Sequence, residues 1–141
     1  MSAEYMLRAL HISKKALPDC VPNPPVGCVL VKNGEVVSEG VTQTIGGNHA
    51  EVQALNAYDG TMDGVIAYVT LEPCSFVGRT PACANTLVAS GIKHVIVSLL
   101  DPDTRNSGEG IRILEQSGIK VDVGLCHKEV CDFLEQYLGK S

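Results

Sequence analysis

The chain has 141 residues, 45% of them hydrophobic, which suits a single domain spanning residues 1–141. Its formal net charge is −5, from 11 Lys and Arg against 16 Asp and Glu. Nucleic acid backbones are usually bound by a basic patch, so this charge balance disfavours a nucleic acid partner. A small phosphorylated substrate remains compatible with it. The apolar stretches are strand-sized and no signal-peptide region stands out, so we expect no membrane span, a cytoplasmic location and cysteines that remain thiols.

The first part of the chain predicts a helix, a hairpin and a second helix. Apolar residues recur at near-helical spacing over 2–16, and a proline-rich turn follows. The β-branched run 26–31 indicates a strand, and Asn33-Gly34 is a strong hairpin signal before a return strand over 35–41. The next helix is predicted over 49–58.

The rest of the chain alternates buried strands with helices. The predicted strands cover 65–71, 94–100 and 121–125, and the predicted helices cover 82–90, 110–116 and 128–138. This alternation favours parallel crossovers, whereas the hairpin adds an antiparallel edge. We therefore expect an α/β fold, a three-layer α/β/α sandwich around a five-stranded mixed sheet, with ligands near strand ends and helix starts.

Three potential metal ligands lie at such junctions. His49 begins a predicted helix, Cys74 follows a predicted strand, and Cys83 lies near the start of the next helix. One imidazole and two thiolates suit Zn²⁺, and three protein ligands leave a fourth tetrahedral position for a catalytic water. Zinc would lower the pKa of that water towards neutrality. Glu51, two residues beyond His49, would then take a proton from the water and deliver it to a ring nitrogen and to the leaving amine.

The order of these residues agrees with the signature of zinc deaminases, in which His-x-Glu precedes Pro-Cys and a second Cys. Here eight residues, 75–82, separate Cys74 from Cys83, rather than two. A structural zinc site would need a fourth ligand, and no remaining Cys or His has a metal-like spacing with the three. The pattern therefore predicts a catalytic zinc site and a hydrolytic deaminase.

The chain resembles the cytidine deaminase superfamily, and more closely the deaminase domain of bacterial riboflavin biosynthesis enzymes. The segments that carry the resemblance extend over nearly the whole chain and comprise residues 22–24, 26–29, 49–55, 67–75, 78–83, 101–103 and 118–119. The eight-residue gap between the two cysteines is similar to that of the riboflavin branch. The resemblance implies the same zinc ligands, His49, Cys74 and Cys83, and the same proton shuttle, Glu51.

The resemblance also implies a substrate, a diaminopyrimidinone that bears a ribosylamino 5-phosphate. It implies that Asn23 helps to hold this molecule and that Arg79 reaches its phosphate, which the planar guanidinium fork suits. Thr42 and Phe76 stand where the family usually has His, in loops expected to contact the substrate. Backbone N–H groups at the helix start near Ala50 are candidates to anchor the ring carbonyl.

Three hypotheses about function remain open at this point. The family's deaminase is often fused to a reductase domain, for which 141 residues leave no room. Either a separate reductase acts on the product, or the substrate is another small aminated heterocycle, nucleoside or nucleotide. A catalytically silent zinc-binding partner subunit is the third hypothesis, against which the carboxylate of Glu51 argues. The resemblance further implies a homo-oligomer.

Overall fold

The computed structural model describes residues 2–44, 46–75 and 82–138, and its centre is a mixed sheet in the order β2-β1-β3-β4-β5. The strands are β1 (Gly27–Lys32), β2 (Glu35–Val41), β3 (Val65–Leu71), β4 (His94–Leu99) and β5 (Lys120–Val123). β1 runs antiparallel to both β2 and β3, whereas β3, β4 and β5 are parallel. The prediction of a five-stranded mixed sheet is confirmed.

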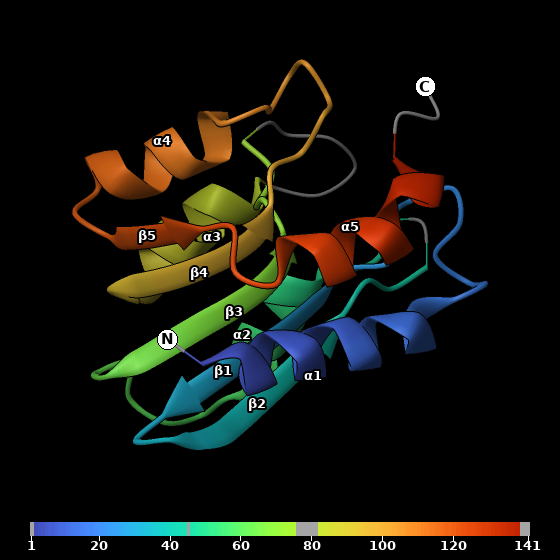
Figure 1. The fold of residues 1–141 in the computed structure, drawn as a ribbon. Helices are drawn as coiled ribbons and strands as arrows, with labels where there is room; N and C mark the ends of the chain where they lie inside the picture. The colour runs from blue at the N-terminus through green and yellow to red at the C-terminus, as the bar shows by residue number, and fades with distance from the viewer. Residues whose placement is uncertain (1, 45, 76–81, 139–141) are drawn as a thin grey trace.

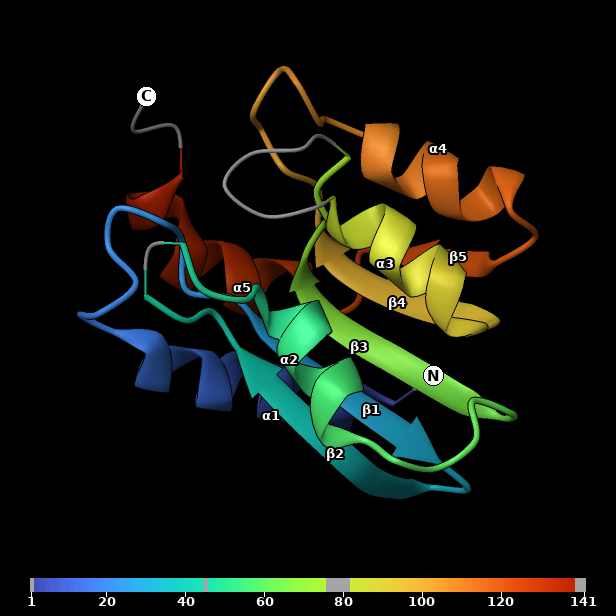
Figure 2. The same ribbon diagram turned by 180° about the vertical axis from the view of Figure 1, so that it is seen from behind.

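Helices cover both faces of this sheet. They are α1 (Ala3–Ser13), α2 (Ala50–Ala57), α3 (Cys83–Ser90), α4 (Glu109–Gln116) and α5 (His127–Leu134), with short 3-10 turns over Lys14–Ala16 and Glu135–Tyr137. Helices α1 and α5 lie on one face (Figure 1), and α2, α3 and α4 lie on the other (Figure 2). The predicted α/β/α layering is therefore confirmed, and the α-helix expected over 2–16 ends at Ser13 and continues as a 3-10 turn.

Local chemistry explains the hairpin and the interior strands. Asn33 and Gly34 have φ angles of 53° and 75°, the left-handed conformation of a two-residue turn that pairs Lys32 with Glu35. Residues 28–31 of β1 are all buried, as are 95–99 of β4. Strands covered on both faces have no solvent side, so they appear as continuous apolar runs rather than alternating ones.

A close approach between β2 and α2 determines where the second helix lies. A Cβ atom on Gly40 would stand 2.2 Å from the carbonyl oxygen of Ala50 and 2.5 Å from the backbone nitrogen of Ala54. The buried hydroxyl of Ser38 donates a hydrogen bond of 2.6 Å to the carbonyl oxygen of Ala54. Only glycine allows this contact, so β2 holds the start of α2 against the sheet.

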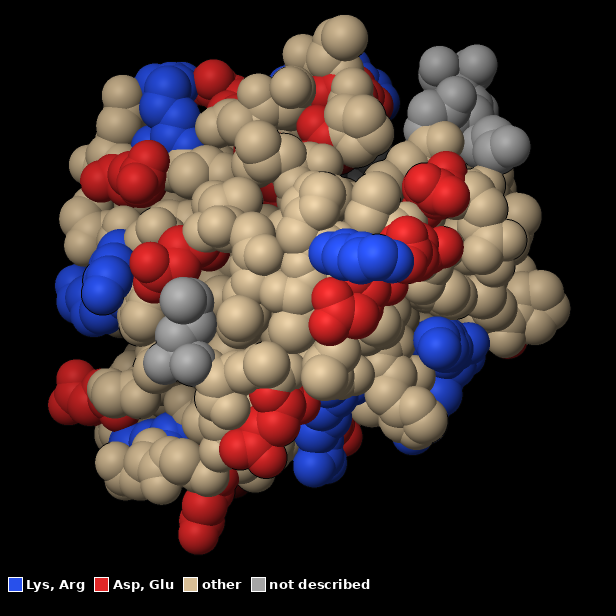
Figure 3. All heavy atoms as spheres, in the orientation of Figure 1, with Lys and Arg blue, Asp and Glu red and all other residues tan. Residues whose placement is uncertain are grey.

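Charges of both signs are interspersed on the molecular face that carries α1 and α5, as Figure 3 shows. The blue Lys and Arg side chains on this face form no continuous stripe. Within the described part of the chain, no helix has the length and apolar character needed to cross a membrane.

Candidate active site

The three predicted zinc ligands come together at the carboxyl end of β3. His49 immediately precedes α2, Cys74 follows β3 by three residues, and Cys83 is the first residue of α3. The Nδ1 atom of His49 lies 3.0 Å from the Sγ atom of Cys83 and 3.8 Å from the Sγ atom of Cys74. Each residue therefore contributes one ligand atom to a common point, and these atoms all lie within 4.8 Å of one another.

This spacing fits a zinc ion. Tetrahedral zinc with Zn–S bonds of about 2.3 Å and Zn–N bonds of about 2.0 Å places its ligand atoms roughly 3.5–3.8 Å apart. The two distances from His49 to the sulfurs, 3.0 and 3.8 Å, lie around that range. Among residues 2–44, 46–75 and 82–138, these are the only His, Cys and carboxylate groups close enough together to hold a metal ion. Three ligands correspond to the open coordination of a catalytic zinc site.

The two cysteines of the cluster have pKa values shifted in opposite directions. The pKa of Cys74 is lowered to about 4, first because the thiol of Cys83 donates to it and further through His49 and the backbone N–H of Cys83. That N–H lies 3.1 Å from the Cys74 sulfur. The pKa of Cys83 is correspondingly raised, because it keeps the proton it donates and because it is buried. The site therefore holds a preformed thiolate, and metal binding would release the second proton.

Glu51 is a buried carboxyl group beside this cluster. It is the second residue of α2 and only 4% exposed. Burial raises the pKa of Glu51 to about 7, its own backbone N–H and the charge of His49 lower it, and the Cys74 charge raises it. A carboxyl group with a pKa near neutrality both accepts and donates a proton at the pH of the cell.

Ala50 provides a second polar group at the same helix start. It is the first residue of α2 and its side chain is fully buried. The first N–H groups of a helix have no acceptor within the helix, and they lie at the positive end of its dipole. An N–H donor of this kind suits a carbonyl oxygen on a ring held beside Glu51.

The structure places Asn23 and Thr42 in adjoining segments near the start of β1. Asn23 is half-buried, and its backbone N–H donates to the carbonyl oxygen of Cys20 at 2.8 Å. Thr42 is 6% exposed, and its hydroxyl accepts from the N–H of Val26 at 2.9 Å and donates to the carbonyl oxygen of Pro24 at 3.2 Å. The Thr42 hydroxyl thus ties down the segment that carries Asn23. Substrate contacts by these two residues stay predictions.

Phe76 and Arg79, which stand between the two cysteines in the sequence, lie outside the described residues. Their predicted contacts with the substrate, and the phosphate contact of Arg79 in particular, stay predictions. None of the six cysteines forms a disulfide, as expected. Cys28 is fully buried, and burial together with the charge of Glu51 raises the pKa of its thiol well above the ordinary value.

Two polar residues that the sequence did not single out also belong to this region. The carboxylate of Glu72, next to Pro73 and Cys74, is 3% exposed and accepts several backbone N–H groups. Asn106 is also 3% exposed and donates to the carbonyl oxygen of Pro73. The sequence did contain a signal for Glu72, which is a charged residue directly after a buried apolar strand. A charged group at such a position is buried only when it is hydrogen-bonded, so it is a candidate to hold nearby backbone groups.

The sequence profile of the cytidine and deoxycytidylate deaminase zinc-binding region matches residues 1–99. The chain belongs to this family, and it is a zinc-dependent hydrolytic deaminase. Over 125 residues it is 47% identical to the diaminohydroxyphosphoribosylamino-pyrimidine deaminase of Buchnera aphidicola subsp. Schizaphis graminum, an alignment that covers 89% of this chain and 85% of that protein.

Solved structures give the same result. RibD of Acinetobacter baumannii superposes with a TM-score of 0.92 at 40% identity, covering 96% of this chain and 38% of that one. The diaminohydroxyphosphoribosylaminopyrimidine deaminase/5-amino-6-(5-phosphoribosylamino)uracil reductase of Thermotoga maritima superposes with a TM-score of 0.86 at 37% identity, covering 96% and 39%. The chain therefore spans most of the Buchnera protein and less than two-fifths of these two longer chains. Its predicted similarity to the deaminase domain of riboflavin biosynthesis enzymes is confirmed.

Proposed function

We propose that this protein deaminates the riboflavin precursor 2,5-diamino-6-(5-phosphoribosylamino)pyrimidin-4(3H)-one. One water is consumed, the bond between a ring carbon and its exocyclic amine is broken, a carbonyl oxygen replaces the amine and ammonia leaves. The observation that carries the proposal is the convergence of His49, Cys74 and Cys83 in a chain that is 47% identical to a deaminase named for this class of substrate.

In this proposal His49 binds zinc through Nδ1, and Cys74 and Cys83 bind it through their sulfurs. The bound ion supplies a water whose pKa is low enough for nucleophilic attack near neutral pH. The backbone N–H of Cys83, 3.1 Å from the Cys74 sulfur, stabilises that thiolate before and after binding.

Glu51 carries the protons. Its carboxylate accepts a proton from the attacking water, gives it to a ring nitrogen, and then delivers a second proton to the departing amine. Both steps need a group that is partly ionised at the working pH, and the pKa of about 7 that burial gives to Glu51 supports this role. The N–H of Ala50 at the start of α2 orients the ring by donating to its carbonyl oxygen.

The remaining contacts position the phosphorylated arm of the substrate. Asn23 holds the substrate from the segment tied by Thr42, and Arg79 binds the phosphate as a bidentate cation. Thr42 and Phe76 are further candidates for substrate contact. The net charge of −5 supports a small substrate rather than a nucleic acid.

The proposal extends to the setting of the enzyme. Residues 1–141 form one deaminase domain that works in the cytoplasm as a homo-oligomer, and a separate reductase acts on its product. Support for a reductase step after the deamination comes from the T. maritima relative, whose name joins a deaminase to a uracil reductase.

Ammonia release from the purified, zinc-loaded protein tests the proposal. We expect turnover of the riboflavin precursor and none of cytidine, deoxycytidylate, guanine or adenosine. Zinc-loaded protein that turns over one of those four instead would reassign the substrate. If the wild type and Glu51→Gln are equally inert on every compound, the proposed activity is rejected in favour of the catalytically silent zinc-binding subunit.

A further inference from the structure

The segment that delivers Cys74 is held from one side by a buried carboxylate. Oε1 of Glu72 accepts the backbone N–H of Asp101 at 3.1 Å, and both oxygens accept that of Gly108, at 3.0 and 2.9 Å. Oε2 also accepts the N–H of Ile111 at 3.3 Å. All three donors belong to the loop after β4 and to the first turn of α4. One side chain therefore joins the end of β3 to a segment 29–39 residues away.

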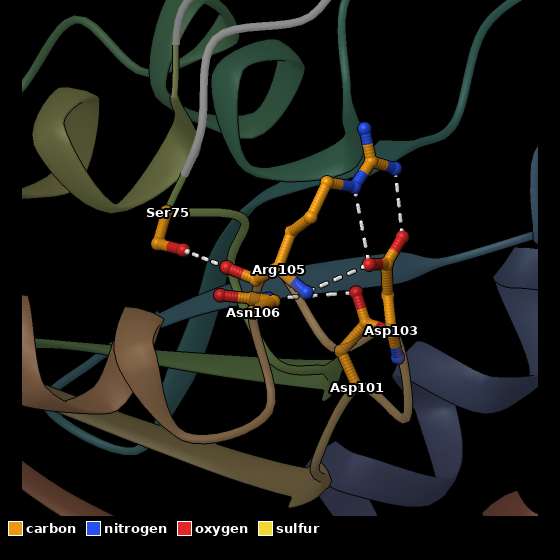
Figure 4. A network of polar contacts seen from close by, with 5 residues as sticks. All are labelled: Ser75, Asp101, Asp103, Arg105 and Asn106. Carbon is orange, nitrogen blue, oxygen red and sulfur yellow. Dashed lines mark hydrogen bonds and ion pairs between the residues drawn. The ribbon is translucent and has the colours of Figure 1, made fainter.

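Asn106, which contacts Asp101 within the same loop (Figure 4), also holds the backbone next to Glu72. Its Nδ2 donates to the carbonyl oxygen of Pro73 at 3.2 Å, and its Oδ1 accepts the N–H of Gly110 at 3.1 Å. A Cβ atom on Gly110 would stand 2.0 Å from that same Pro73 oxygen. On the far side of Cys74, the hydroxyl of Ser75 donates to the carbonyl oxygen of Arg105 at 3.2 Å. The backbone is thus held on both sides of the cysteine.

Cys74 is held independently by α3. The N–H of Ala84 donates to the Cys74 carbonyl oxygen at 3.0 Å, and the N–H of Cys83 donates to its sulfur. Helices α3 and α4 pack side by side on the same face of the sheet (Figure 2). The position of the sulfur therefore depends on two sets of contacts, one to α3 and one to the loop before α4.

We propose that Glu72 and Asn106 are positioning residues for the metal centre. Together they form what we term the Cys74 clamp, which fixes the Cys74 sulfur at the distance from His49 and Cys83 that zinc requires. The inference rests on the proposed function in one respect, that Cys74 is a zinc ligand. Neither clamp residue is a metal ligand, and neither contacts the reacting atoms.

The chemistry of the clamp explains why a carboxylate stands at position 72. An ionised carboxylate only accepts hydrogen bonds, and its two oxygens offer enough lone pairs for all the N–H donors that face it. A Gln at this position would turn an NH₂ group towards N–H donors, which leaves them without an acceptor. The negative charge also lies at the start of α4, where the helix dipole favours it.

Zinc affinity separates positioning from a merely structural role. We expect Glu72→Gln to weaken zinc binding about 10- to 100-fold in a chelator competition, as loss of residues that orient metal ligands does elsewhere. The thiolate-to-metal absorption of the cobalt-substituted protein should also change. Leu114→Ala is the matched control, because Leu114 is a fully buried residue of α4. It should lower the melting temperature and leave zinc affinity and the cobalt spectrum unchanged.

Asn106→Ala provides a second test that leaves the carboxylate in place, and it replaces Glu72→Gln if that variant does not fold. Asn106→Ala should also weaken zinc binding. Glu72→Asp, which keeps a carboxylate, should bind zinc more tightly than Glu72→Gln. The inference is overturned if folded clamp variants keep wild-type zinc affinity and cobalt spectra, or if Leu114→Ala loses as much zinc at equal stability. Cys74→Ser distinguishes failure of the clamp proposal from failure of the proposed function, because full retention of zinc in this variant would refute the metal site itself.

Discussion

The Nδ1 atom of His49 lies 3.0 Å from the Sγ atom of Cys83, although the two residues are 34 positions apart along the chain. The contact joins the start of α2 to the start of α3, and Cys74 completes the group from the end of β3. Parallel strands and their following helices place these junctions at one edge of the sheet, which is where α/β proteins bind ligands.

Loss of either thiolate should remove the metal. We expect about one zinc ion per chain in the wild type and almost none in Cys74→Ser or Cys83→Ser, because two ligands cannot hold a catalytic zinc ion tightly. Elemental analysis after gel filtration measures this. Cys131→Ser is the control, since Cys131 lies in α5 and is not among the clustered ligands. Normal zinc content in Cys74→Ser would contradict the assignment.

Replacement of Glu51 should separate catalysis from metal binding. Glu51→Gln should reduce kcat by about 10²- to 10⁴-fold, the usual contribution of general acid–base catalysis, because the amide cannot carry the proton. Zinc content should be retained, since Glu51 is not a ligand. Glu129→Gln, an exposed change in the first turn of α5, should keep full activity. A Glu51→Gln protein as active as the wild type would assign the proton transfer to another group.

The buried carboxyl of Glu51 should also make the stability of the metal-free protein depend on pH. Its pKa rises from the ordinary value of 4.5 to about 7 on folding, so the folded state binds the proton more tightly than the unfolded state. The stabilisation is fully present below pH 4.5 and is lost as pH rises through about 7. Over this pH range the shift lowers the free energy of unfolding by about 3 kcal/mol.

Urea unfolding of chelator-treated wild type and Glu51→Gln at about pH 5 and about pH 8 measures this effect. The lowered pKa of Cys74 acts in the opposite direction and is present in both proteins, so the difference between them reports Glu51 together with its interaction with Cys74. We expect Glu51→Gln to gain stability relative to the wild type at the higher pH. An identical pH dependence in the two proteins would show that Glu51 titrates normally when folded.

The hydroxyl of Thr42 should stabilise the segment that carries Asn23. Thr42→Val should lower the free energy of unfolding by about 1–3 kcal/mol, because the buried N–H of Val26 loses its acceptor. It should also raise the KM for the substrate, since the bond to Pro24 next to Asn23 is lost. Thr42→Ser keeps the hydroxyl and should restore both values to near wild type. If the Ser and Val variants have the same free energy of unfolding and the same KM, the hydroxyl contributes to neither quantity.

Local patterns in the amino-acid sequence were enough to predict the elements of the fold and the kind of chemistry. Asn33-Gly34 adopts the left-handed angles that its turn requires, and the predicted apolar segments form β1, β3 and β4. Turn conformation and the tendency to form a strand depend on residues close together in the chain, so both can be predicted from local sequence. His49, Cys74 and Cys83 were identifiable because zinc accepts few ligand types, and strand–helix junctions are where such ligands gather.

How those ligands are held in place became visible only in the three-dimensional structure. Glu72 accepts its hydrogen bonds from residues 29–39 positions further along the chain, and Asn106 reaches the Pro73 carbonyl across 33 positions. The Thr42 hydroxyl likewise turned out to be engaged with Pro24 and Val26. Such bonds form only when strand order and helix packing bring distant backbone groups together, and no local spacing in the sequence encodes that meeting.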